Sequence, residues 1–274
     1  MSKIKKAISG IVAMSMLLSV PVSAGAASID SNNLESSYSI GSESIFNINT
    51  PGDYIAYLKQ LQAESPSLQS LRSVIQLSEQ SNVNDFLNKY ISLPEDKQQE
   101  FVDYLNDPEF TKTVFSAMNG NVGTSQAFYS GDLVVGTSEV REIAPSLNNI
   151  IAFKKGDTKD HSLYTEATAT LFGLDFIKTR VEISYRTTEV KDFSSEITSI
   201  LNKKGILVQN YSPGAHITKE ENNVVLASNK LTGSYSVDWS WNFIWDKLGL
   251  TIGVKRQWID FDKAGKGDGG IYNL

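Results

Sequence analysis

Cysteine, histidine, serine and the acidic residues carry most enzyme chemistry, and this chain of 274 residues supplies them unevenly. Cysteine is absent, which excludes a thiolate nucleophile, a disulfide framework and every cysteine-ligated zinc or iron–sulfur site. Only His161 and His216 are imidazoles, so one chain cannot form a three-histidine metal site. His161 stands in a Lys- and Asp-rich segment that we expect to be a loop. We interpret both histidines as surface residues, because no neighbouring motif provides a catalytic partner.

Other motifs for hydrolysis or cofactor binding are incomplete. The stretch Gly136–Val140 surrounds Ser138 but lacks the second glycine that the tight turn of a nucleophile elbow needs. No Walker loop or dinucleotide fingerprint is present, so we predict no catalytic residue and no cofactor. Paired carboxylates for glycoside cleavage remain open, because 31 acidic residues supply many pairs and the sequence does not give their separation.

The segment from Asp260 to Gly265 begins like a calcium-binding loop. Acids at the first and third positions and glycine at the sixth fit that pattern. Ala264 stands at the fifth position and Ile271 at the twelfth, where oxygen ligands are required. We therefore predict no metal site, and we expect the glycine-rich tail from Asp262 onward to be loose.

Aromatic and apolar side chains occupy every second position of one segment: Tyr235, Val237, Trp239, Trp241, Phe243 and Trp245. Small polar residues stand between them, which predicts a strand with one aromatic face. Asp246 and Lys247 predict a turn into a second strand, where the alternating apolar residues are Leu248, Leu250, Ile252 and Val254. This hairpin would hold all four tryptophans, including Trp258.

Three interpretations of the aromatic face stay open. It forms half of a β-sandwich core, or a platform that stacks on sugar rings, or a hairpin that inserts into a membrane. We expect a mixed arrangement, in which Trp241 is buried and Trp245, next to the turn, is partly exposed. The candidate binding residues are Trp245, Trp239 and Tyr235.

A run of short amphipathic helices is predicted within residues 50–119. Pro51, Pro66, Pro94 and Pro108 each stand where a helix would begin, because the missing N–H costs nothing there. A further helix is predicted near Asn82. The spacing from Ser92 to Glu95 predicts a capping box. Such short helices must pack on one another or on the rest of the chain.

Between Asn119 and Gly131 the sequence is rich in glycine and polar residues, so we place a domain boundary there. Beyond it, alternation predicts strands at residues 133–135, 150–153, 163–171, 176–185, 206–208 and 224–227. Helical spacing of Ile197, Ile200 and Leu201 predicts a helix over residues 192–204. The segment 211–214 favours a type II turn with a glycine at positive φ.

The first 26 residues have the layout of a secretory signal peptide. Lys3, Lys5 and Lys6 precede an apolar stretch, and small residues follow that suit cleavage after Ala24 or Ala26. The apolar stretch is shorter than the roughly 20 residues of a membrane-spanning helix, so we predict removal and secretion. Losing three of the 25 basic residues leaves 22 against 31 acidic ones. Such an acidic protein is not expected to bind nucleic acid.

The order of these parts resembles that of a known group of proteins. The helical stretch LPEDKQQEFVDYLNDPEF, the later stretches TATLFGLDFIKTRVEISYR and VQNYSPGA, and the GKGDGG tail are similar to secreted Bacillaceae proteins related to the large, non-lantibiotic geobacillin-type bacteriocins. The resemblance implies an antibacterial protein secreted by a Gram-positive bacterium. It assigns no functional residue.

We therefore predict an α+β protein, in which a small N-terminal helical unit precedes a C-terminal antiparallel β-sandwich-like domain. The predicted parts are a signal peptide (1–26), a flexible N-terminus (27–49), the helical unit (50–119) and the β domain (125–274). A second interpretation makes the helical unit a pro-segment that is removed. The expected function is non-enzymatic antibacterial action at the cell envelope or membrane of a target bacterium. An envelope- or glycan-binding module and an extracellular hydrolase are the alternatives.

Overall fold

The computed structural model describes residues 48–63, 80–143, 156–191, 194–245 and 248–274. These residues belong to one compact unit, which spans residues 41–274. For residues 80–82, 191, 245 and 248–250 the backbone alone is described. The predicted signal peptide, the helix expected after Pro66 and the strand expected at 150–153 lie outside the described residues.

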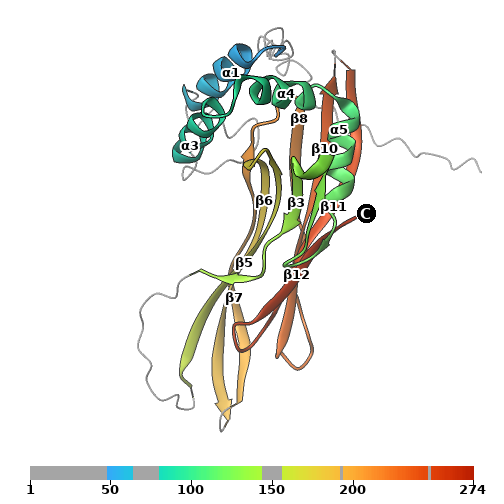
Figure 1. Ribbon diagram of the computed structural model, residues 1–274. Coiled ribbons are helices and arrows are strands. Elements are labelled where there is room, and N and C mark those ends of the chain that lie inside the picture. Colours follow the sequence, from blue (N-terminus) through green and yellow to red (C-terminus); the bar gives the residue numbers. More distant parts are fainter. Residues whose placement is uncertain (1–47, 64–79, 144–155, 192–193, 246–247) are drawn as a thin grey trace, which may run out of the picture. The chain divides into compact units, whose positions relative to one another are not determined.

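Helices come first in the described chain and strands follow (Figure 1). The helices are α1 (Pro51–Ala63), α3 (Gln80–Ile91), α4 (Glu95–Leu105) and α5 (Pro108–Ala117). Asp107 caps α5, because its carboxylate accepts a 2.9 Å hydrogen bond from the backbone N–H of Glu109. The predicted capping box is wrong, since the Ser92 hydroxyl instead donates to the carbonyl of Lys89. No helix within the described ranges has the length and apolarity needed to cross a membrane.

Two antiparallel sheets pack on each other, so the class is α+β with a sandwich-like arrangement. Sheet A has the order β1-β12-β11-β10-β8, with β9 paired to β10. Its strands are β1 (Gly120–Asn121), β8 (Ala215–Glu221), β9 (Val225–Leu226), β10 (Thr232–Trp245), β11 (Leu248–Asp262) and β12 (Gly267–Asn273). Sheet B has the order β2-β3-β5-β6-β7, with β4 paired to β5. Its strands are β2 (Ser125–Phe128), β3 (Leu133–Thr137), β4 (Arg141–Glu142), β5 (Thr158–Leu171), β6 (Leu174–Lys191) and β7 (Ser194–Asn210).

The core lies between the two sheets, where strand alternation brings their apolar faces together. The inward residues of β10 are nearly inaccessible to water: Tyr235, Val237, Trp239, Trp241 and Phe243. The polar residues between them are partly exposed. Burial of Trp241 confirms the prediction for that residue, and for these five side chains the aromatic face is core.

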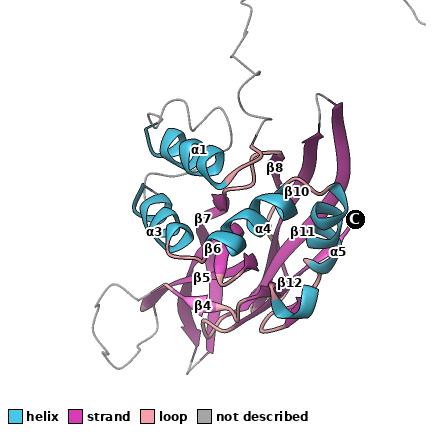
Figure 2. Ribbon diagram, turned by 45° about the horizontal axis from the view of Figure 1, so that its top comes forward, coloured by secondary structure: helices cyan, strands magenta, loops and turns pink. Residues whose placement is uncertain are grey.

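Helices α1, α3 and α4 lie at one end of the sandwich, and α5 lies beside β10 and β11 (Figures 1 and 2). The ring of Phe101 in α4 is 6.3 Å from that of Phe172, in the β5–β6 turn. Tyr54 of α1 donates a 2.9 Å hydrogen bond to the carbonyl of Tyr211, which follows β7. The ring of Phe101 in α4 lies 6.2 Å from that of Phe176 in β6. Phe115 of α5 contacts Trp241 with 5.8 Å between ring centroids. Helices and sheets therefore share one apolar core.

The glycine-rich stretch 119–131, predicted to be a boundary loop, belongs to both sheets. Gly120 of β1 pairs with Ile271 of β12, and Ser125 of β2 pairs with Gly136 of β3. At Gly136 a Cβ would stand 2.7 Å from the carbonyl oxygen of Thr124. Glycine is needed at position 136, just after this stretch, because two backbones approach closely there. Within 119–131 the short strands β1 and β2 alternate with turns at residues 122–123 and 129–131.

The helix predicted over residues 192–204 is wrong, because from Ser194 onward this segment is strand β7. Tyr185 of β6 pairs with Ile200, whereas Thr187, two residues on, pairs with Ile197. This β-bulge inserts one extra residue, so two residues three positions apart reach the same inner face. The spacing that resembles a helix therefore arises from an irregular strand.

Two further local predictions are wrong. The tail expected to be loose forms β12, which pairs with β11 from Gly267 to Asn273. Pro213 and Gly214 do form a turn, but Gly214 is not among the glycines at positive φ. Its Cβ would stand 2.6 Å from the ring of Phe243, so glycine is required there for close packing.

Candidate functional site

Sheet A has an outer face, which points away from sheet B and carries Ser234, Ser236, Trp258, Asp260, Asp268 and Tyr272. The register sets these residues in rows across β10, β11 and β12. One row aligns Ser234 with Asp260 and Asp260 with Asp268. The next row is centred on Trp258, which lies opposite Ser236 on one side and Gly270 on the other. An acidic row and an aromatic row are therefore neighbours on this face.

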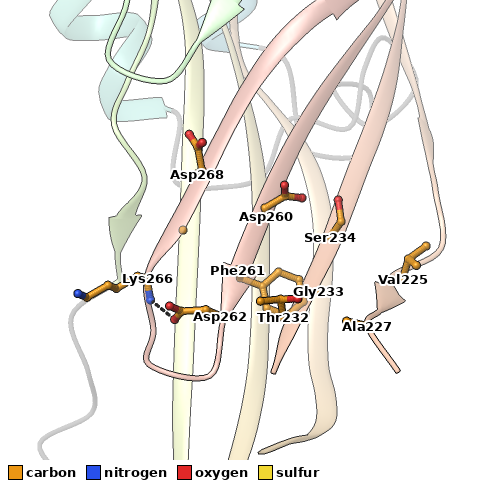
Figure 3. Close-up of a pocket in the computed structure, with 11 residues that line it drawn as sticks. Val225, Ala227, Thr232, Gly233, Ser234, Asp260, Phe261, Asp262, Lys266 and Asp268 are labelled. Carbon is orange, nitrogen blue, oxygen red and sulfur yellow. Dashed lines mark hydrogen bonds between the residues drawn. The ribbon is translucent and has the colours of Figure 1, made fainter. Parts of the chain in front are cut away.

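The acidic row borders an open hollow of about 560 Å³ (Figure 3). Asp260 and Asp268 are both exposed, and Phe261, whose ring is buried on the inner face of the sheet, also borders the hollow. Phe261 pairs across the strands with Gly233, where a Cβ would stand 2.5 Å from the ring. The missing side chain at Gly233 therefore lets the ring lie against the backbone of β10.

Asp262, at the edge of the hollow, organises the turn between β11 and β12. Its Oδ1 accepts a 2.8 Å hydrogen bond from the N–H of Ala264 and a 2.9 Å hydrogen bond from the N–H of Lys266, the second of which is drawn in Figure 3. Gly265 follows at a φ of +82°, a conformation that glycine adopts without strain. The calcium-like pattern is thus the signature of this tight turn.

Among the tryptophans whose side chains are described, Trp258 is partly exposed, whereas Trp239 and Trp241 are buried. A Cβ at Gly270 would stand 3.2 Å from its Nε1, so the indole lies across the backbone of β12 at that glycine. The row beyond it contains Arg256 and Tyr272, which face each other across β11 and β12. Tyr272 is 41% exposed, which adds a second aromatic ring to this face.

Arg256 and Asp238 fix the polar end of the outer face. The guanidinium donates from Nε and Nη2 to both carboxylate oxygens of Asp238, each at 2.7 Å. These charged hydrogen bonds hold the pKa of Asp238 below its ordinary value and raise the pKa of Arg256. The bidentate pair keeps both side chains in one orientation beside the aromatic rings.

Comparison of the chain with models of protein families, with curated proteins and with solved structures gives no match.

This outer face has the chemistry of a binding surface. Asp260 and Asp268 can accept hydrogen bonds from hydroxyl or ammonium groups, and Trp258 offers a flat ring to stack on. Both carboxyl groups lie open to water. The arrangement therefore suits ligand binding.

Two of the predicted binding residues lie elsewhere. Trp239 and Tyr235 are each 1% exposed between the sheets, and the Trp239 indole donates a 3.1 Å hydrogen bond to Gln257. Neither can stack on an external ligand, so their predicted role is wrong for this folded state. The side chain of Trp245 lies outside the described residues.

Trp258 was missed because a bulge reverses the alternation of β11. Trp241 pairs with Gly253, but Asn242 pairs with Thr251, so Ile252 is the extra residue. Beyond this bulge, Lys255 and Gln257 face the core, whereas Trp258 points outward. The sequence does contain a signal for the outward position of Trp258. Trp258 and Asp260 alternate with the apolar residues Ile259 and Phe261, so Trp258 shares a strand face with an acidic residue.

The two histidines and Ser138 lie in different surroundings. His216 on β8 is exposed, as predicted. His161 is a strand residue of β5 and only 2% exposed, which corrects its placement in a surface loop. Its ring stacks on Tyr185 at 5.2 Å, and burial lowers its pKa. Ser138 accepts a 3.0 Å hydrogen bond from the N–H of Glu166, which is a structural contact.

Within the described part of the chain, no three His, Asp or Glu side chains are grouped closely enough to hold a metal ion.

Proposed function

We propose that the protein is an exported, non-enzymatic antibacterial protein that binds the cell envelope of its target through the outer face of sheet A. The observation that supports this most is the acidic row beside the partly exposed Trp258. The ligand we infer is a saccharide that carries hydroxyl and amino groups. The signal-peptide pattern supports export, and the helical unit followed by a β-sandwich-like domain supports the expected organisation of the secreted form.

Charge and shape both support a saccharide with amino groups. The hollow is bordered by Asp260, Asp262 and Asp268 against one cation, Lys266, so it attracts positive charge. Trp258 offers the flat apolar surface on which sugar rings stack. The hollow volume of about 560 Å³ lies within the roughly 300–1,000 Å³ typical of small-ligand pockets.

Sedimentation with isolated Gram-positive cell walls tests the proposal. The mature protein should pellet with the walls, and Trp258→Ala should weaken binding by about tenfold or more, as loss of one stacking contact and its neighbours predicts. The matched control is Tyr164→Ala, which removes a partly exposed aromatic ring from the outward side of sheet B. Equal binding by both variants would exclude this face as the binding surface.

The hydrolase and antibacterial alternatives are separated by a second pair of assays. The mature protein should clear lawns of related Gram-positive bacteria without releasing reducing sugar from their walls. The double variant Asp260→Asn/Asp268→Asn removes both exposed carboxylates and should reduce wall binding. Release of reducing sugar that this double variant abolishes would instead establish the two acids as hydrolytic groups.

A further inference from the structure

A second hollow lies between the sheets, at the end away from the helices. The inner face of sheet B is apolar along most of its length, but its last rows are charged. In β5 the inward parity of Leu163 continues through His161 to Lys159, and Asp157 directly precedes the strand. In β6 it continues through Thr187 to Glu189. Inward positions of a β-sandwich are normally apolar, so charged residues at these positions are exceptions. Such exceptions are expected at functional sites.

These residues line a hollow of about 180 Å³. That is well above the roughly 10–15 Å³ needed for one water molecule. Lys263, in the β11–β12 turn of sheet A, closes it from the opposite side. The turn is held against sheet B because the Tyr185 hydroxyl donates a 2.6 Å hydrogen bond to the carbonyl of Asp262.

Among the residues that line this hollow, Oε1 of Glu189 is buried without a hydrogen-bond partner. The side chain of His161 is 2% exposed, and its Nε2 lies 3.4 Å from the hydroxyl of Thr187, which also lines the hollow. The Nδ1 of His161 lies against Gly265 and is 3.8 Å from the carboxylate of Glu142. Buried polar atoms normally have partners, so the Glu189 oxygen indicates capacity for a ligand or water.

The charges of the lining are arranged in rows. Asp157 and Glu189 lie at the outer end, where the N–H of Glu189 donates to the carbonyl of Asp157 at 2.9 Å. Lys159, paired with Thr187, lies one row deeper, about 7 Å along the strands. Neither Lys159 nor Lys263 forms an ion pair with another described residue. Two ammonium groups without an ion-pair partner among the described residues therefore border the hollow, and two carboxylates lie one row nearer the ends of the strands.

We propose that this hollow binds a small zwitterion, such as a short peptide with free ends, with its carboxylate toward Lys159 and Lys263 and its ammonium toward Asp157 and Glu189. The lining carries two positive and two negative groups, so it suits a ligand whose own charges cancel but are separated. The site is distinct from the outer face of sheet A, and the proposal does not rest on the saccharide proposal.

NMR of the two histidine rings tests this proposal on the whole mature protein, with alanyl-alanine as the probe. The signals of His161 should shift in a saturable way, whereas those of His216, exposed on β8, should stay in place. The N-acetylated and the C-amidated dipeptide each lack one charge. Each should bind at least about tenfold more weakly than alanyl-alanine, as loss of a charged hydrogen bond predicts.

Lys159→Gln and Glu189→Gln should each weaken binding of alanyl-alanine, and Lys89→Gln on α3 is the matched control. Lys159 is exposed, so its variant keeps the test valid even where a change at Glu189 impairs folding. An unmoved His161 signal at about 10 mM dipeptide overturns the proposal, since that excludes even millimolar affinity. Equal shifts with the capped dipeptides, or full affinity in the Lys159 variant, overturn it as well.

Discussion

At the scale of single residues, Lys255 is the most unusual side chain of the core. It is fully buried, its Nζ donates a 2.6 Å hydrogen bond to Asn273, and the same atom lies 4.3 Å from the ring centroid of Phe115. Burial lowers the pKa of Lys255 from 10.5 to about 8. The charged form at neutral pH is therefore tolerated at a cost in stability.

This shift predicts a pH dependence of folding. Between pH 8 and 10 the unfolded chain binds the lysine proton more fully than the folded chain, so the free energy of unfolding should rise with pH. The rise from this group should amount to roughly 2 kcal/mol, measured by urea unfolding. Lys255→Met should remove it, whereas Lys112→Met, at an exposed position on α5, should retain it.

At the scale of elements, the bulge in the β10–β11 hairpin decides which tryptophans are structural. Trp241 is inside and Trp258 outside, so the same substitution should have different effects. Trp241→Ala should reduce the free energy of unfolding by about 3–5 kcal/mol. Trp258→Ala should cost less than half of that, because its ring is already partly hydrated. Equal losses in chemical denaturation would contradict the assigned alternation.

The sequence predicts well those elements whose signals are local. Proline at positions 51 and 108 marks helix starts because its fixed φ and missing N–H act within one turn. Regular alternation likewise locates β5 and β10. It does not show the bulges that turn residues 194–204 into a strand or that place Trp258 outward, since register shifts depend on the partner strand. The candidate site therefore could not be derived from alternation alone.

At the scale of the whole molecule, the helices and the sheets share one core. Tyr54, Phe101 and Phe115 connect three helices to both sheets, and each is at most 8% exposed. A secreted form that lacks residues 50–119 would expose Phe176 and Trp241 to water. We therefore expect the mature protein to retain these residues. Its intact mass, measured by mass spectrometry, should correspond to a chain that begins near Gly25 or Ala27. A secreted species beginning after residue 119 would instead support the pro-segment interpretation.

The claim that the outer face of sheet A is the binding surface is tested most directly by hydrogen exchange. Backbone amides should be followed by mass spectrometry with and without soluble fragments of Gram-positive cell wall. Protection is predicted for residues 232–236 and 256–272, which carry Ser234, Trp258, Asp260 and Asp268. Protection confined to the helices or to sheet B, with these segments exchanging as in the free protein, would contradict the claim.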